Sequence, residues 1–343
     1  MIRIALTLIA VLSLFAPSAQ GASFDCAKAS TSFEEAICAD EGLSEQDEVL
    51  AQAYATALGG LSTGAANEVK AGQKAWLNFA QRACSDEAQP IAGAYTEEQT
   101  QCLASTFRGR IGALEASRMQ GGYRFYPIDR YLVQPDPELK EGDFGYKAAE
   151  KEFHIVKIDR DDDLAVAFNT AIDELIVEQG DFFTPGTIDI SPDDPTSDYD
   201  ITTQVSEVEN YRISLTYNQW WYGHGAAHGN YFITHHHFLT EQKRMLEASD
   251  IFDAGDWQAT LVDLTIAHLK SDIGEENLFD DYAKNVSEIA VQPVRWILSD
   301  KGLGTQFNIY EVTAYAAGAI EVTIPWDELS GILAADAEKI AYY

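Results

Sequence analysis

Apolar residues recur at three- and four-residue steps through the first third of the chain. One run carries Leu43, Leu50 and Tyr54, and this spacing places side chains on one face of a helix. Gly59-Gly60 and the segment 86–90 interrupt the pattern. The sequence therefore predicts three helices, over residues 40–54, 65–84 and 97–118.

After Gly121-Gly122 the pattern becomes mixed, because the alternation typical of strands appears beside helical runs. Strands are predicted over residues 153–158, 202–209, 211–222, 230–239, 296–298, 305–309 and 319–324, and helices over 163–178, 257–270 and 326–333. Strands cluster and helices interrupt them, which predicts an α+β fold with a mainly antiparallel sheet. We therefore expect a small all-α domain, residues 22–119, followed by an α+β domain, residues 120–343.

The first 21 residues have the pattern of a cleaved secretory signal peptide. Arg3 precedes an apolar run from Ile4 to Phe15, and small residues lead to a predicted cleavage after Gly21. The run is shorter than the roughly 20 apolar residues of a membrane-spanning helix, and no later segment qualifies. The mature protein is expected to be periplasmic or secreted, with no membrane span.

Four cysteines lie in the predicted helical domain, and the rest of the chain has none: Cys26, Cys38, Cys84 and Cys102. An even number in an oxidising compartment predicts two disulfides. Three pairings are possible, and proximity favours Cys26–Cys38 with Cys84–Cys102, whose loops are each worth roughly 3 kcal/mol. A zinc site is the alternative, but the chain has no closely spaced Cys-x-x-Cys pair.

The chain is strongly acidic, with 55 acidic and 23 basic residues and a formal net charge of −32. The second domain carries most of this charge, since residues 120–343 hold 41 acids and 15 bases. Such a surface repels nucleic acid and anionic lipid and accelerates encounters with cationic partners. General solubility or adaptation to a salty habitat would explain the same charge.

Residues 220–237, WWYGHGAAHGNYFITHHH, hold five of the seven histidines. Gly223–Gly229 predicts a loop between two strands in which the backbone can adopt positive φ and approach another surface. Glycine makes a helical His-x-x-x-His zinc site improbable between His224 and His228, and His228 is expected to have a structural hydrogen-bonding role.

On the following strand, His235 and His237 would share one face, as surface residues or as a pair of metal ligands. We interpret the stretch as a binding platform without metal or other cofactor. Of its aromatic residues, one would point outwards as an interface anchor, because neighbours on a strand face opposite ways. The candidate binding residues are Trp220, Trp221, Tyr222, His224, His228 and Asn230.

The helical domain resembles the LprI-like family of exported bacterial proteins, whose named member inhibits lysozyme. The similarity rests on the four cysteines and on Ala36-Ile37, Leu43, Asp47, Tyr54, Gln73, Trp76, Arg108 and Arg110. Family members commonly have an arginine four residues after the tryptophan, where this chain has Ala80, with Arg82 nearby. The resemblance implies lysozyme binding and adds Trp76, Arg82 and Arg108 as candidate contacts.

The second domain resembles the extracytoplasmic domain shared by the anti-sigma factor RsiV and the N-terminal part of the peptidoglycan deacetylase PdaC. The matching residues include Tyr126-Pro127, Asn169, Ala227-His228-Gly229, Asp250-Ile251-Phe252, Tyr315-Ala316-Ala317-Gly318 and Val322-Thr323-Ile324-Pro325. The RsiV ectodomain is a lysozyme receptor, so this resemblance also implies lysozyme binding. It adds Tyr315 as a candidate contact.

These observations predict a non-catalytic protein of the bacterial cell envelope that binds, and thereby inhibits, a basic lysozyme-like muramidase. One alternative is a peptidoglycan-binding or stress-sensing module without inhibition. Another is a metal-dependent hydrolase that uses the histidines of residues 224–237. The three hypotheses differ in what they require of the structure: a docking surface, a glycan groove or a metal site.

Overall fold

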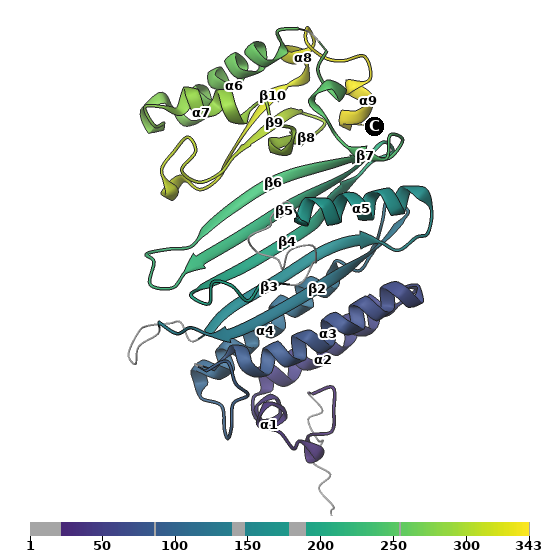
Figure 1. The fold of residues 1–343 in the computed structure, drawn as a ribbon, viewed down its shortest axis with the longest axis vertical. Coiled ribbons are helices and arrows are strands. Elements are labelled where there is room, and N and C mark those ends of the chain that lie inside the picture. Colours follow the sequence, from purple (N-terminus) through teal and green to yellow (C-terminus); the bar gives the residue numbers. More distant parts are fainter. Residues whose placement is uncertain (1–21, 86, 139–147, 178–189, 254, 343) are drawn as a thin grey trace, which may run out of the picture.

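A computed structural model describes residues 22–85, 87–138, 148–177, 190–253 and 255–342. The predicted signal peptide therefore lies outside the described residues. A helical N-terminal region lies at one end of the molecule, a large sheet crosses the middle, and a smaller sheet with its own helices lies at the other end (Figure 1). This arrangement confirms the predicted α+β fold class.

The N-terminal region consists of α1 (Ser32–Ala39), α2 (Glu41–Leu58), α3 (Thr63–Ala83) and α4 (Glu97–Glu115). Side chains cap their first turns: Thr31 and Thr96 form capping boxes, and Asp40 and Ser62 accept from backbone amides. The disulfides are Cys26–Cys38 and Cys84–Cys102, which confirms the predicted pairing. The first disulfide joins the segment before α1 to α1, and the second joins the end of α3 to α4.

The helical region packs on the large sheet, and the two share hydrophobic residues. Its core holds Trp76, Phe79 and Phe107 and continues into Val133 and Ala148 of the sheet. The helices thus form a layer against β2 (Figure 1). The domain boundary at residue 120 stays a prediction.

The large sheet has the strand order β1-β2-β3-β4-β5-β6-β7. Its members are β1 (Met119–Gln120), β2 (Tyr123–Pro135), β3 (Ala148–Ile158), β4 (Ser197–Val208), β5 (Arg212–Gly223), β6 (Asn230–Leu239) and β7 (Arg244–Met245). Every pairing is antiparallel except that of β3 with β4. Between these two strands the chain forms α5 (Asp163–Val177), whose Phe168, Ile172 and Ile176 pack on one face of the sheet.

The C-terminal part forms a second, antiparallel sheet with the order β10-β9-β8. The helices and strands of this C-terminal part are α6 (Trp257–Ile273), α7 (Tyr282–Ile289), β8 (Trp296–Leu298), β9 (Gly302–Phe307), β10 (Ile320–Pro325), α8 (Trp326–Leu329) and α9 (Ala337–Tyr342). The expected turn joins β8 to β9. The predicted helix over 326–333 was too long, because α8 ends at Leu329 and Leu333 instead forms a bridge with Phe252.

Candidate functional site

The β5–β6 connection is the glycine loop that the sequence predicts. Gly225 has a φ of 81°, and a Cβ atom on Gly229 would lie 2.8 Å from Nε1 of Trp220. These two positions therefore favour glycine, one for its backbone conformation and the other for the close approach of an indole. The loop presents the candidate residues on both faces of the hairpin.

The three consecutive aromatic residues divide between the two faces of β5, as the alternation predicts. Trp220 has 41 % of its surface exposed, whereas Tyr222, on the same face, is buried. The Tyr222 hydroxyl donates to the carbonyl of Ala226 at 2.8 Å and so fixes the loop. Trp221 points to the opposite face, where it lines a groove.

His224 is held between two carboxylates and has little access to a partner. Its Nδ1 pairs with Asp136, and its Nε2 lies 3.1 Å from Oδ1 of Asp198. Burial lowers the pKa of His224, but the two carboxylates outweigh burial and raise it. The His224 side chain therefore ties the loop to β4 and to the segment that follows β2.

His228 belongs to an aromatic cluster at the loop. Its ring stacks on Tyr315 at 4.0 Å between centroids, and its Nε2 lies 3.3 Å from the Tyr310 hydroxyl. Tyr315 donates to the carbonyl of Gly229 at 2.9 Å. Residues far apart in the sequence thus meet here, and Tyr310 belongs to the cluster although it was not a candidate from the sequence.

The expectation that His235 and His237 are surface residues was wrong for His237. Its Nδ1 contacts Oγ of Ser214 at 2.8 Å and its Nε2 the carbonyl of Trp296 at 2.8 Å, so it connects β5, β6 and β8. Burial, followed by the charge of Arg212, lowers the pKa of His237 to about 3. The C-terminal sheet packs over this end of β6 and removes the imidazole from water, which local alternation does not reveal.

Among the residues that the structure describes, no group of three or more His, Cys, Asp or Glu side chains is arranged to hold a metal ion. His235 and His236, like His237, have a lowered pKa, because burial disfavours the charged form. The histidines of β6 are thus shielded from solvent by the packing around them.

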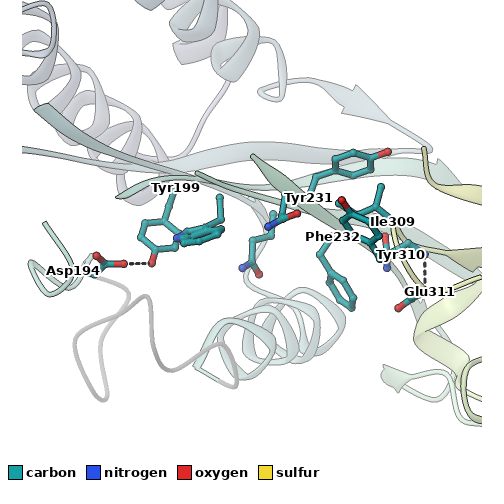
Figure 2. A pocket seen from close by; sticks show the side chains of 11 residues that line it. Asp194, Tyr199, Tyr231, Phe232, Ile309, Tyr310 and Glu311 are labelled. Carbon is teal, nitrogen blue, oxygen red and sulfur yellow. Dashed lines mark hydrogen bonds between the residues drawn. The ribbon is translucent and has the colours of Figure 1, made fainter. Parts of the chain in front are cut away.

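A groove of about 530 Å³ lies on the Trp221 face of the sheet (Figure 2). The described residues that line it come from the segment before β4, from β4, β5 and β6, and from the turn after β9: Asp194, Tyr199, Gln219, Trp221, Asn230, Tyr231, Phe232, Asn308, Ile309, Tyr310 and Glu311. Trp221 and Asn230 were candidates from the sequence. The period of two along β5 and β6 would also have indicated Gln219 and Phe232, but Tyr199 and Tyr310 depend on tertiary packing.

The candidate residues of the helical region do not form one site. Trp76 is 1 % exposed and packs edge-on against Phe107 in the core. Arg82 donates to the carbonyls of Ala88 at 2.7 Å and Val133 at 3.3 Å. Arg108 is exposed and bonds Oγ of Ser105 at 2.7 Å.

A second groove, of about 600 Å³, lies in the helical region between α1 and the start of α4. The ten described residues that line it include three acids and no base: Ser32, Glu35, Ala36, Ala39, Asp40, Ala94, Tyr95, Glu97, Thr100 and Gln101. Sequence patterns do not reveal this site, because its acids belong to different helices. Its chemistry suits a cationic side chain.

Fold and site together define an α+β protein with a disulfide-bonded helical region, one surface groove on that region and another on the large sheet. Residues 26–114 match the family model "Lysozyme inhibitor LprI", which confirms the LprI-like region predicted from the sequence. Residues 249–327 match the model "Protein of unknown function (DUF3298)", and they lie in the region that resembles RsiV and PdaC. Among curated proteins, none matches the chain.

Two solved structures of DUF3298 family members are similar to this chain. One, from Bacteroides fragilis, is 18 % identical with a TM-score of 0.47, and the match covers 64 % of this chain and 96 % of that one. The other, from Pseudomonas aeruginosa, is 14 % identical with a TM-score of 0.46, covering 63 % and 96 %.

Proposed function

We propose that this protein is exported to the cell envelope and binds a basic, lysozyme-like muramidase through its helical region, with inhibition as the consequence. The observation that carries the proposal is the match of residues 26–114 to the lysozyme inhibitor model. No residue is assigned a catalytic role. Residues 22–119 are the proposed binding domain, and residues 120–343 form a second proposed domain.

The paired cysteines are typical of proteins from oxidising compartments, which supports export. No helix in the described part of the chain is both long and apolar enough to cross a membrane. Cleavage after Gly21, and release into the periplasm or the medium, belong to the proposal.

Charge supports a basic partner. A net charge of −32 steers a cationic enzyme towards this chain and raises the association rate at low salt. The acidic groove between α1 and α4 is the contact that we propose for a lysine or arginine of that enzyme.

A binding assay with a purified basic lysozyme tests the proposal. We expect measurable affinity at low salt, a steep loss of affinity as salt rises, and slower lysis of a cell-wall suspension. No binding at a large molar excess at low salt would remove the proposal, and binding without slower lysis would remove inhibition.

A pair of matched double variants locates the contact. Glu35→Gln with Glu97→Gln removes two charges from the groove, and we expect about a five-fold loss of affinity. Glu45→Gln with Glu48→Gln removes two exposed charges from α2, outside the groove, and should weaken binding less than about two-fold. Equal effects would show general charge attraction rather than a contact in the groove.

A further inference from the structure

The floor of the groove on the large sheet alternates aromatic rings with side-chain amides. Trp221 of β5 pairs with Asn230 of β6, and Gln219 of β5 pairs with Phe232 of β6. Paired residues point to the same face, with their Cβ atoms roughly 5 Å apart. Each ring therefore has an amide beside it across the strands and another along its own strand.

The two floor amides are available to a ligand. Within the described part of the chain, the side chain of Asn230 has no hydrogen-bond partner, and Gln219 has only a long contact of 3.4 Å with the Tyr217 hydroxyl. Each can both donate and accept.

The polar side chains at the ends of the groove already form hydrogen bonds or ion pairs within the protein, and these interactions fix the shape of the groove. Asn308 bonds both backbone groups of Ile233, at 2.8 and 3.1 Å, and so fixes the turn after β9 against β6. Glu311 pairs with Arg295, and Asp194 accepts from the Tyr199 hydroxyl at 2.7 Å (Figure 2).

Exposed aromatic faces complete the groove. Phe232 is 40 % exposed, and the guanidinium of Arg295 stacks on its ring, 4.8 Å from the centroid. Tyr310 is 51 % exposed and has a φ of 65°, a left-handed conformation that costs a tyrosine free energy. Conformations of this kind persist where the surroundings enforce them, often at binding sites.

The charge of the groove disfavours an anionic ligand. Of the eleven described residues that line it, none is cationic, and both carboxylates are hydrogen-bonded within the protein. An anionic ligand would meet no countercharge among them and would approach a chain of net charge −32.

We propose that this groove is a binding site for a neutral oligosaccharide. The C–H face of a sugar ring packs on the electron-rich face of an aromatic ring, while hydroxyl or acetamido groups at its edge bond the adjacent amide. Trp221 and Phe232 supply the faces, Gln219 and Asn230 the edge contacts, and Tyr310 a wall. A proline-rich peptide also uses aromatic grooves, but the alternation of ring and amide suits a sugar better.

This site is separate from the proposed lysozyme contact on the helical region and does not rest on it. The probes are chitotetraose and cellotetraose, titrated into the full chain by calorimetry and followed by tryptophan fluorescence, with a proline-rich decapeptide as a third ligand. We expect at least one sugar to bind and to change the tryptophan emission of the chain, because Trp221 lines the groove. Binding of neither sugar at millimolar concentration overturns the proposal, as does binding of the peptide in their place.

Variants locate the site. Phe232→Ala and Gln219→Leu are each expected to weaken sugar binding at least about five-fold while thermal unfolding and lysozyme binding stay unchanged. The control is Trp220→Phe, on the opposite face of β5, which should keep the affinity and the fluorescence response. Equal affinity in all three variants would place the sugar elsewhere and overturn the assignment.

Discussion

Arg110 of α4 and Asp129 of β2 form an ion pair in which neither side chain is exposed to solvent. Arg110 also donates to Oε1 of Gln73 at 2.9 Å, and Asp129 accepts from His154 of β3 at 2.9 Å. Burial alone would raise the pKa of Asp129, but His154 and Arg110 lower it. An arginine on which the family resemblance rests therefore joins the helical region to the sheet.

We predict that Arg110→Ala destabilises the protein by about 3–5 kcal/mol, because it leaves Asp129 buried without its main countercharge. Urea unfolding at neutral pH measures this change. Arg108→Ala, two residues away but exposed, should stay within about 0.5 kcal/mol of the native protein. Similar losses in the two variants would contradict the proposed role of the ion pair.

Glu150 of β3 predicts a loss of stability as the pH rises from 4.5 to about 8. Burial and the negative charges of Glu152 and Asp198 raise the pKa of Glu150 to about 8. Its protonated form therefore stabilises the fold fully below the unfolded pKa of 4.5, and this contribution is lost as pH rises through about 8.

Glu150→Gln should therefore be more stable than the native chain at pH 9. The expected difference is about 1 kcal/mol, because the residue is only partly shielded from solvent. Near pH 4.5 the two proteins should be equally stable. Denaturant titrations at the two pH values give the comparison, with the exposed Glu115→Gln as control. A variant less stable than the native protein at pH 9 would refute the prediction.

His237 predicts the opposite dependence in acid. Its pKa is lowered to about 3, so the neutral form stabilises the fold fully above the unfolded pKa of 6.5, and stability falls as pH drops from there towards 3. His237→Gln should reduce this fall by up to about 1 kcal/mol per pH unit, as measured by unfolding between pH 7 and 4. A slope unchanged by the substitution would show that His237 does not titrate on unfolding.

The disulfide between Cys84 and Cys102 closes a loop with a sequence separation of 18. Replacing both cysteines with alanine should cost about 3 kcal/mol, because the unfolded chain regains the entropy that the crosslink removes. Thermal unfolding of the double variant, compared with the native chain with and without reductant, tests this value. If reduction changes the double variant as much as the native chain, the Cys26–Cys38 bond carries the effect instead.

Local patterns were sufficient for much of the fold. The helical periodicity around Leu43 and Leu50 predicted α2, cysteine proximity predicted the pairing, and alternation placed Trp220 and Trp221 on opposite faces of β5. These features depend on residues that are close together in the chain, so short stretches of sequence are enough to predict them.

β2 was not among the predicted strands. Helices cover one of its faces and α5 lies on the other, so apolar residues are needed on both sides and no clear alternation results. A strand buried on both faces lacks the period-two signal on which the other assignments relied.

Sequence patterns alone were enough for helices such as α2, for strands such as β5 and β6, for the disulfide pairing and for the acidic charge, because each follows from residue type and short-range spacing. Only the tertiary structure decided that Arg110 faces Asp129, that His237 is buried under β8, and that Tyr199, Trp221 and Tyr310 line one groove. The packing of the helices on β2, the strand order and the packing of the second sheet on β6 bring these groups together, and all three arise from long-range burial of apolar surface.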